Sequence, residues 1–123
     1  MKKVLIIDDD ALIGKLLEIK LTSLGEFDVI RALDGDEGLK MIKEQAPDLV
    51  VLDLMMPRKS GFEVLEDLQK APTKGSVHVL VLSNLSSGAD KDRALKLGGH
   101  TFFIKSEMTI GGIVEYIIKQ LKA

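Results

Sequence analysis

The chain has 123 residues, 46% of them hydrophobic and 29% charged, and its 17 Lys and Arg against 19 Asp and Glu give a formal net charge of −2. A chain of this length can bury a core without disulfides or zinc, and the absence of cysteine excludes both disulfides and thiol chemistry. The near balance of charge includes no basic stripe, so we predict no direct binding of nucleic acid.

Membrane-spanning segments are also excluded, because the longest apolar runs, Val4–Ile7, Leu49–Leu52 and Val79–Leu82, fall far short of the roughly 20 residues needed. The first of these runs is too short for a signal peptide and ends in three aspartates. We therefore expect a single cytoplasmic domain over residues 1–123.

Strand-like and helix-like segments alternate five times along the chain, which predicts a parallel α/β sheet with helices on both faces. The predicted strands are Val4–Asp8, Phe27–Ala32, Leu49–Asp53, Val77–Ser83 and Thr101–Lys105. Three of them contain the continuous aliphatic runs typical of strands covered on both faces, so we place them inside the sheet. The second and fifth strands are more mixed and are predicted at the edges.

The first three helices are predicted from apolar spacing and from capping residues. The stripe of the first is Leu12, Ile13, Leu16, Leu17, Leu21 and Leu24. Gly25 follows it, at a position where glycine commonly ends a helix. The next two begin with the capping pairs Asp34 with Glu37 and Ser60 with Glu63. Pro47 and Pro72 are expected to end them.

The last two helices differ in strength. Ser86–Leu97 is polar through Arg93 and leaves only Ala94, Leu95 and Leu97 for burial, so we predict a marginal, loosely held helix. The final helix has a clear stripe, Ile110, Ile113, Val114, Ile117 and Leu121. Tyr116 lies off that stripe and is expected on an exposed face.

Polar residues gather where the predicted strands end, which is the edge at which open α/β sheets bind ligands. They are Asp8, Asp9 and Asp10, then Asp53, Ser83 and Lys105. Clustered carboxylates raise one another's pKa unless a cation joins them, and Mg²⁺ suits a few carboxylates with water and phosphate. Asp53, after a central strand, is placed to attack phosphorus, while Ser83 and Lys105 can contact the transferred oxygens.

Four motifs resemble those of the receiver domains of two-component response regulators, and the resemblance covers essentially the whole chain. They are VLIIDDD at 4–10, DLMMP at 53–57, the aliphatic strand ending in Ser83, and FFIK at 102–105. The resemblance implies a flavodoxin-like (βα)5 doubly wound parallel sheet with strand order 2-1-3-4-5. It also implies a phosphoacceptor that catalyses only its own phosphorylation and dephosphorylation, rather than a turnover enzyme.

The same resemblance implies a role for each site residue. Asp53 would accept a phosphoryl group from a phosphohistidine on a sensor histidine kinase or a histidine phosphotransfer protein. Mg²⁺ would be held by Asp8, Asp9, Asp53 and the main-chain carbonyl of Met55, with Asp9 the closer of the acidic pair. Ser83 would be the switch hydroxyl, Lys105 the phosphoryl-binding lysine and Phe102 the aromatic switch.

The output surface would be the face made by 86–97, 101–105 and the last helix, with Tyr116 exposed on it. Such a domain would be a monomer, or a dimer that forms on phosphorylation, and would signal to a downstream protein.

Two positions depart from the family pattern beside the expected site. Ser106 stands where a cis proline usually follows the lysine, and a cis bond before serine would cost about 2.5–4 kcal/mol, so the conformation of this loop is left open. Asn84 replaces the small residue that commonly follows the hydroxyl position. Gly99 and His100 also replace a more usual small and acidic pair.

Two other functions are compatible with parts of the pattern. A haloacid-dehalogenase-like phosphohydrolase would use Asp8 as nucleophile and Asp10 as general acid, but Ala11–Leu12 and 106–108 lack that family's Thr and acidic pair, and Asp53 would have no role. A receiver-like binding module that takes no phosphoryl group is the second alternative.

Several residues also have simple structural interpretations. Asp10 is predicted as a helix N-cap, and Phe102 could serve core packing. His78 and His100 have no partner at metal-ligand spacing, so we interpret them as ordinary surface or strand-end residues.

Overall fold

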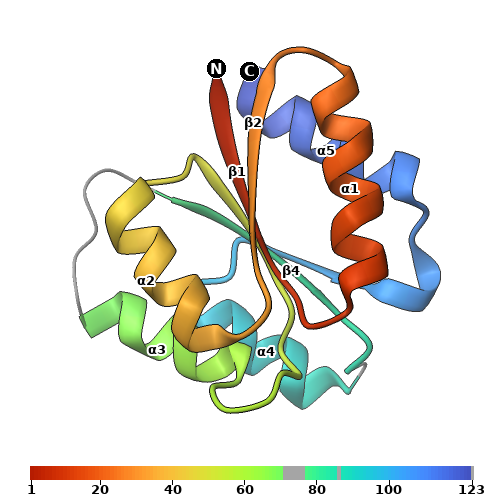
Figure 1. The fold of residues 1–123 in the computed structure, drawn as a ribbon. Helices are drawn as coiled ribbons and strands as arrows, with labels where there is room; N and C mark the ends of the chain where they lie inside the picture. The colour runs from red at the N-terminus through yellow and green to blue at the C-terminus, as the bar shows by residue number, and fades with distance from the viewer. Residues whose placement is uncertain (71–76, 86, 123) are drawn as a thin grey trace.

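The computed structural model describes residues 1–70, 77–85 and 87–122. Strands and helices alternate along the chain (Figure 1). The elements are β1 (Lys2–Ile7), α1 (Ala11–Ser23), β2 (Phe27–Ala32), α2 (Gly35–Gln45), β3 (Leu49–Leu52), α3 (Gly61–Lys70), β4 (His78–Ser83), α4 (Gly88–Lys96), β5 (Thr101–Ile104), a 3-10 turn (Lys105–Glu107) and α5 (Ile110–Lys122). The strands are parallel in the order β2-β1-β3-β4-β5, which confirms the predicted sheet and both of its edges.

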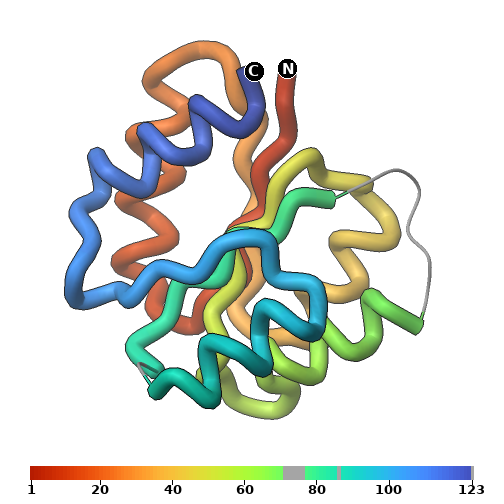
Figure 2. Tube along the Cα trace, turned by 180° about the vertical axis from the view of Figure 1, so that it is seen from behind, coloured from red at the N-terminus to blue at the C-terminus, as the bar shows by residue number. Residues whose placement is uncertain are grey.

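Helices cover the sheet on both faces, with α1 and α5 on one side and α2, α3 and α4 on the other (Figures 1 and 2). The alternation of side chains along each strand divides the core between these sides. In β1, Val4 and Ile6 pack with Leu17 of α1, while Leu5 and Ile7 pack with the cluster beneath α2 and α3. The interior strands are buried on both faces, as their aliphatic runs predict.

The predicted caps set the helix ends. The Asp10 carboxylate accepts the N–H groups of Leu12 and Ile13, and Asp34 accepts that of Glu37 at 2.8 Å. Gly25 follows the end of α1 with φ +72°, in the left-handed region that glycine occupies without strain.

The third helix has a reciprocal cap. The Ser60 hydroxyl accepts the Glu63 N–H at 3.2 Å, and the Glu63 carboxylate accepts the Ser60 N–H at 3.3 Å. The helix ends at Lys70, and Pro72, which was predicted to end it, lies outside the described residues.

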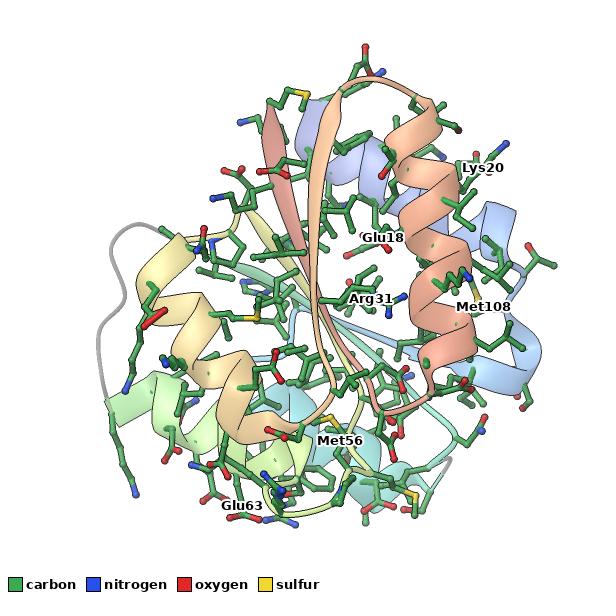
Figure 3. The ribbon with its side chains drawn as sticks, in the orientation of Figure 1. Glu18, Lys20, Arg31, Met56, Glu63 and Met108 are labelled. Atoms are coloured by element: carbon green, nitrogen blue, oxygen red, sulfur yellow. The ribbon has the colours of Figure 1, made fainter. Side chains whose placement is uncertain are left out.

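Charged side chains also link the edge of the sheet to a helix. Arg31 of β2 and Glu18 of α1 point toward one another, with a nitrogen and an oxygen 3.7 Å apart (Figure 3). The stem of Arg31 lies over Gly14, where a Cβ would be 3.5 Å from its Cδ. The aliphatic part of this arginine therefore covers the start of α1 while its charge meets Glu18.

The fourth helix is as weakly packed as its sequence predicts. Within Gly88–Lys96 only Ala94 is buried, and the expected starting residue Ser86 lies outside the described part of the chain. Leu95, which was expected to help anchor the helix, is 38% exposed. It follows Ala94 by one residue, so its side chain is turned by about 100° around the helix axis from the buried position.

The prediction that Tyr116 faces solvent is wrong. The residue is half-buried, and its hydroxyl lies 2.7 Å from His78 Nε2 and also hydrogen bonds with Thr101. Its ring meets the edge of Phe103 with centroids 5.0 Å apart. A tyrosine beside an apolar stripe can bury its ring and still pair its hydroxyl, which the stripe alone does not indicate.

His78 and His100 are also more than ordinary surface or strand-end residues. Their rings stack with centroids 4.6 Å apart, and His100 Nδ1 accepts the Val79 N–H at 3.0 Å. Together with Tyr116 they join the amino-terminal end of β4 to β5 and α5, at the end of the sheet opposite the aspartates.

No helix in the described residues is long and apolar enough to span a membrane.

Candidate functional site

The site is built by the register of the four strands that end at one edge of the sheet. Ile7, Leu52, Val81 and Phe102 form one paired row across β1, β3, β4 and β5. Asp8 and Asp53 come one residue past that row, Ser83 two residues past it, and Lys105 three residues past it. Lys105 therefore starts from farther out than either aspartate, and its long side chain reaches back to them.

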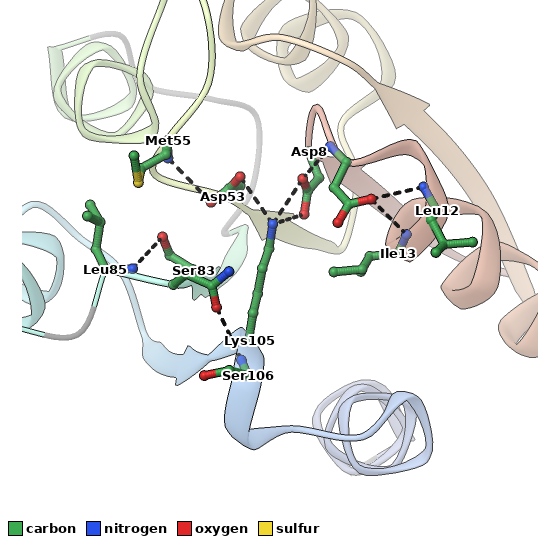
Figure 4. Close-up of polar contacts among 11 residues, drawn as sticks. Asp8, Leu12, Ile13, Asp53, Met55, Ser83, Leu85, Lys105 and Ser106 are labelled. Atoms are coloured by element: carbon green, nitrogen blue, oxygen red, sulfur yellow. Dashed lines mark hydrogen bonds and ion pairs between the residues drawn. The ribbon is translucent and has the colours of Figure 1, made fainter.

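The Lys105 ammonium lies between two buried carboxylates (Figure 4). Its Nζ is 2.9 Å from Asp8 Oδ2 and 3.2 Å from Asp53 Oδ2. The side chains of Lys105, Asp8 and Asp53 are only 10%, 1% and 5% exposed, respectively. Burying a charged group costs free energy unless an opposite charge pairs with it. The Lys105 ammonium therefore offsets the cost of burying the Asp8 and Asp53 carboxylates together.

Burial dominates the electrostatics of Asp8. It raises the pKa of Asp8 from 3.8 to about 6, with a smaller contribution from the negative charge of Asp53. Hydrogen bonds from Lys105 and from the Asp10 N–H act in the opposite direction. Burial also opposes the charge on Lys105, but its hydrogen bond to Asp8 and the charge of Asp53 outweigh that effect and raise its pKa. The lysine is accordingly charged at neutral pH.

Asp9 completes a group of three acidic side chains. One carboxylate oxygen from each of Asp8, Asp9 and Asp53 lies within 4.8 Å of the others, and Asp9 is the exposed member. Closely spaced carboxylate oxygens are the donors that a hard divalent cation prefers, so this donor set fits Mg²⁺. Asp10 is not part of the group, because its carboxylate caps α1.

The backbone behind Asp53 is held by the start of α3. The Gly61 N–H donates to the Leu54 carbonyl at 3.1 Å, and a Cβ added at Gly61 would collide with the Asp53 carbonyl oxygen. On the other side of Asp53, the Met55 N–H donates to its Oδ1 at 3.3 Å (Figure 4). Asp53 is therefore fixed by its neighbours before any ligand arrives.

Ser83 lies at the same edge but stands apart from the ion pairs. It is fully buried, and its hydroxyl accepts the Leu85 N–H at 3.3 Å within its own loop. No hydrogen bond joins it to Asp53 or Lys105 in the part of the chain that the structure describes. Phe102 is half-buried and packs on the side of the sheet covered by α2, α3 and α4, while Phe103 packs on the other, as their alternation predicts.

Sequence reasoning missed one contact at this edge. The Asn84 side-chain oxygen accepts the Ser106 N–H at 3.2 Å, and these are the two positions that depart from the family pattern beside the site. Lys105–Glu107 forms a 3-10 turn, and the described residues contain no cis peptide bond. The sequence contained a signal for this contact, because both positions depart from the family pattern together. Asn84 brings a side-chain amide, and Ser106 brings a backbone N–H that proline lacks.

A shallow groove borders the acidic group. Asp9 lies at its rim, and most of the lining is apolar, including Met55 from the loop after β3 and Leu85 from the loop after β4. Met55 is 58% exposed. The groove beside the acidic group is therefore mostly apolar.

Comparison with known proteins agrees with this geometry. The family profile of the response regulator receiver domain matches residues 4–121. A probable transcriptional regulator ycf27 of Porphyridium aerugineum is 41% identical over 104 residues, which are 85% of this chain and 42% of that protein. The alkaline phosphatase synthesis transcriptional regulatory protein PhoP of Bacillus subtilis is 38% identical over the same shares. The chain thus spans about two fifths of the length of these relatives.

Solved structures show the same architecture. The receiver domain of Francisella response regulator 1452 has a TM-score of 0.87 at 31% identity, with 99% of this chain and 98% of that one covered. The receiver domain of a NarL response regulator from Mycobacterium tuberculosis also has a TM-score of 0.87, at 28% identity, with 99% and 97% covered. Motifs, strand order and matched family agree, and the chain belongs to the receiver domains of two-component response regulators.

Proposed function

We propose that Asp53 is the phosphoacceptor of this receiver domain. The observation that supports it is the buried lysine that contacts Asp53 and Asp8 together at the carboxyl ends of the strands. One Asp53 oxygen forms the new bond to phosphorus while the phosphorus–nitrogen bond of a phosphohistidine breaks. The imidazole, protonated at its other nitrogen, leaves neutral with the electron pair of that bond.

The residues around Asp53 have complementary roles in this proposal. Asp8, Asp9, Asp53 and the main-chain carbonyl of Met55 would hold Mg²⁺, which when bound supplies positive charge to the phosphoryl oxygens. Lys105 keeps its charge at neutral pH and contacts another of those oxygens. Ser83 turns from Leu85 toward the phosphoryl group, so its present hydrogen bond within the loop is the one that breaks.

The partners follow from this chemistry. The donor is a sensor histidine kinase or a histidine phosphotransfer protein, and the chain modifies only itself, in the cytoplasm, as a monomer or a dimer that forms on phosphorylation. The name of one relative, RpaA of Synechocystis, describes a DNA-binding regulator, of which the match covers 43%. We propose that this domain makes no direct contact with nucleic acid, because its charge is nearly balanced.

Intact-mass measurement with a small phosphodonor tests the assignment. Wild type should gain one phosphoryl group only with Mg²⁺, and Asp53→Asn should gain none. A covalent adduct that survives in Asp53→Asn but is lost in Asp8→Asn would instead establish the phosphohydrolase alternative. A known receiver domain in the same assay is the positive control. If it is phosphorylated while wild type stays unmodified, the result would favour the binding module that takes no phosphoryl group.

The output surface is proposed as the face made by α4, β5 and α5. Phosphorylation would draw Ser83 toward Asp53 and let Phe102 move inward, which shifts an existing equilibrium of this face. Amide exchange should then change most in 83–97 and around Phe102 on addition of the phosphodonor. A change of equal size across the whole sheet would contradict a switch located there.

A further inference from the structure

Asn84 and Ser106 join the two loops that carry the hydroxyl and the ammonium of the site. Asn84 directly follows Ser83, Ser106 directly follows Lys105, and the Asn84 Oδ1 accepts the Ser106 N–H at 3.2 Å. The last paired residues of β4 and β5 are Ser83 and Ile104. The side-chain bond therefore continues the connection between β4 and β5 past the point where the strand pairing ends.

The donor of this bond exists because residue 106 is not proline. A proline has no N–H, so the same loop with a proline could not form the contact. Here the turn is held on both sides, since the Met108 N–H donates to the Lys105 carbonyl at 3.2 Å and the Ser106 N–H donates to Asn84. Serine's own hydroxyl is not needed for either bond.

The turn controls where the Lys105 ammonium lies. Lys105 is the first residue of the turn and must reach back to Asp53 and Asp8 from three residues past the paired row. A rotation of the turn would move the whole lysine side chain, so a bond that fixes residue 106 also limits the positions of Nζ. Asn84 makes that bond from the first position after Ser83, where β4 ends.

We propose that Asn84 is a positioning residue that, through the Ser106 N–H, holds the Lys105 turn in register with the Ser83 loop. The inference rests on the proposed phosphorylation of Asp53. It implies that Lys105 and Ser83 respond together, because a displacement of Ser83 toward Asp53 pulls on the bond to residue 106. The turn leads directly into α5, so the same bond also links the loop before α4 to the loop before α5.

The test uses Asn84→Ala, which removes the acceptor, and Ser106→Pro, which removes the donor. Ser106→Ala is the matched control, because it keeps the N–H and deletes only the hydroxyl. With acetyl phosphate and Mg²⁺, Asn84→Ala and Ser106→Pro should each slow phosphorylation roughly 3- to 10-fold, the range that one hydrogen bond of typical net strength would give. Ser106→Ala should match wild type, and Asn84→Ala with Ser106→Pro should be no slower than the slower single variant.

A second readout separates positioning from general stability. In a Lys105→Ala background, Asn84→Ala should slow phosphorylation no further, because the lysine through which it acts is gone. In NMR spectra, the Ser106 amide should lose protection from exchange in Asn84→Ala and keep it in wild type.

Two results would overturn the inference. One is an Asn84→Ala protein that phosphorylates as fast as a phosphorylatable wild type, and the other is an equal slowing by Asn84→Ala in the presence and absence of Lys105. A wild type that gains no phosphoryl group would instead contradict the proposed function. The protection of the Ser106 amide would still report whether Asn84 holds the turn.

Discussion

Helices α3 and α4 begin alike and are held very differently. Each follows a serine N-cap with glycine, and the cap hydroxyl accepts an N–H three residues on, from Glu63 in one and Asp90 in the other. Gly61 of α3 lies against the backbone of Asp53, whereas a Cβ at Gly88 of α4 would meet no atom of the described residues within 4 Å. The same capping pattern therefore begins α3, which is packed firmly behind the site, and α4, which is held loosely beside it.

The residues after the glycine cause the difference. Helix α3 buries Phe62, Val64 and Leu65, but α4 buries only Ala94. Arg93 links it to α3, because it lies over the Phe62 ring at 4.1 Å and pairs with Glu66, and the Gln69 side chain also donates to the Lys96 carbonyl at 3.3 Å. Elements with few buried contacts open at low free energy. Capping thus decides where each helix starts, while burial decides whether it can move.

Truncating one leucine in each helix should give the largest contrast. Leu65 is 1% exposed and Leu95 is 38% exposed. Leu65→Ala should lower the free energy of unfolding by about 2–5 kcal/mol, because it removes buried methyl groups and leaves a cavity. Leu95→Ala should change it by less than about 1 kcal/mol. Urea unfolding measures both, and equal losses would show that α4 is as firmly packed as α3.

Replacing the two glycines tests the contacts at the helix starts. Gly61→Ala should destabilise the protein by about 1–3 kcal/mol or more, since the backbone of Asp53 would have to move. Gly88→Ala should stabilise it by up to about 1 kcal/mol, because the unfolded chain loses freedom and nothing clashes. Gly61→Ala should also slow phosphorylation by a small phosphodonor. A neutral Gly61→Ala would mean that α3 does not hold Asp53 in place.

The loop before each of these helices contributes an apolar side chain to the groove beside the acidic group. Met55 and Leu85 line the groove beside Asp9, and neither can orient a water for attack on a phosphorylated Asp53. We therefore expect a long-lived phosphorylated form, and about 10-fold faster decay in Met55→Asn with Leu85→Glu, which corresponds to about 1.4 kcal/mol. The measurement is loss of the phosphorylated mass after donor removal. Unchanged decay in the double variant would exclude this role for the two side chains.

A weaker, pH-dependent effect on stability is expected at His78, at the end of β4 far from α4. Burial and, secondarily, the neighbouring His100 lower the pKa of His78 below 6.5. As pH falls through 6.5, His78 gains a proton in the unfolded chain before the folded one, so its contribution reduces stability until the lowered folded pKa is reached. Asp8 has the opposite sign, because its folded pKa of about 6 lies above its unfolded one.

Comparing wild type with His78→Gln isolates the histidine, because Asp8 contributes equally to both proteins. The melting temperature of each protein is measured at pH 7.5 and at pH 5.5. Acidification should lower the melting temperature of wild type relative to that of the variant. Equal falls would mean that His78 titrates alike in the folded and unfolded chains.

Much of the fold could be predicted because its signals are local. The aliphatic runs of β1, β3 and β4, the capping pairs and Gly25 each act within a few residues, and all describe the same sheet. The edge where Asp8, Asp53, Ser83 and Lys105 gather followed from strand direction alone. Their roles came from the family resemblance and stay predictions until they are tested.

Two of the errors concern contacts between residues far apart in the chain. The Tyr116 hydroxyl meets His78 and Thr101 across three elements, and the acceptor on Asn84 meets an N–H 22 residues later. Spacing along one helix or strand carries no information about such partners. Leu95 was misplaced for a related reason, since a helix with one buried residue has no stripe to fix its rotation.

Asp53, Ser83 and Lys105 lie one, two and three residues past the paired row of strand residues. This spacing limits which insertions and deletions the site can accept. Moving Lys105 by one residue along β5 would turn its side chain to the opposite face of the sheet. Moving it by two would keep the face but change its distance to Asp53 by roughly 6–7 Å, about the length of the side chain itself. Substitutions can adjust this site gradually, but length changes between Thr101 and Lys105 cannot, whereas a length change in the loop between α4 and β5 leaves this spacing unaltered.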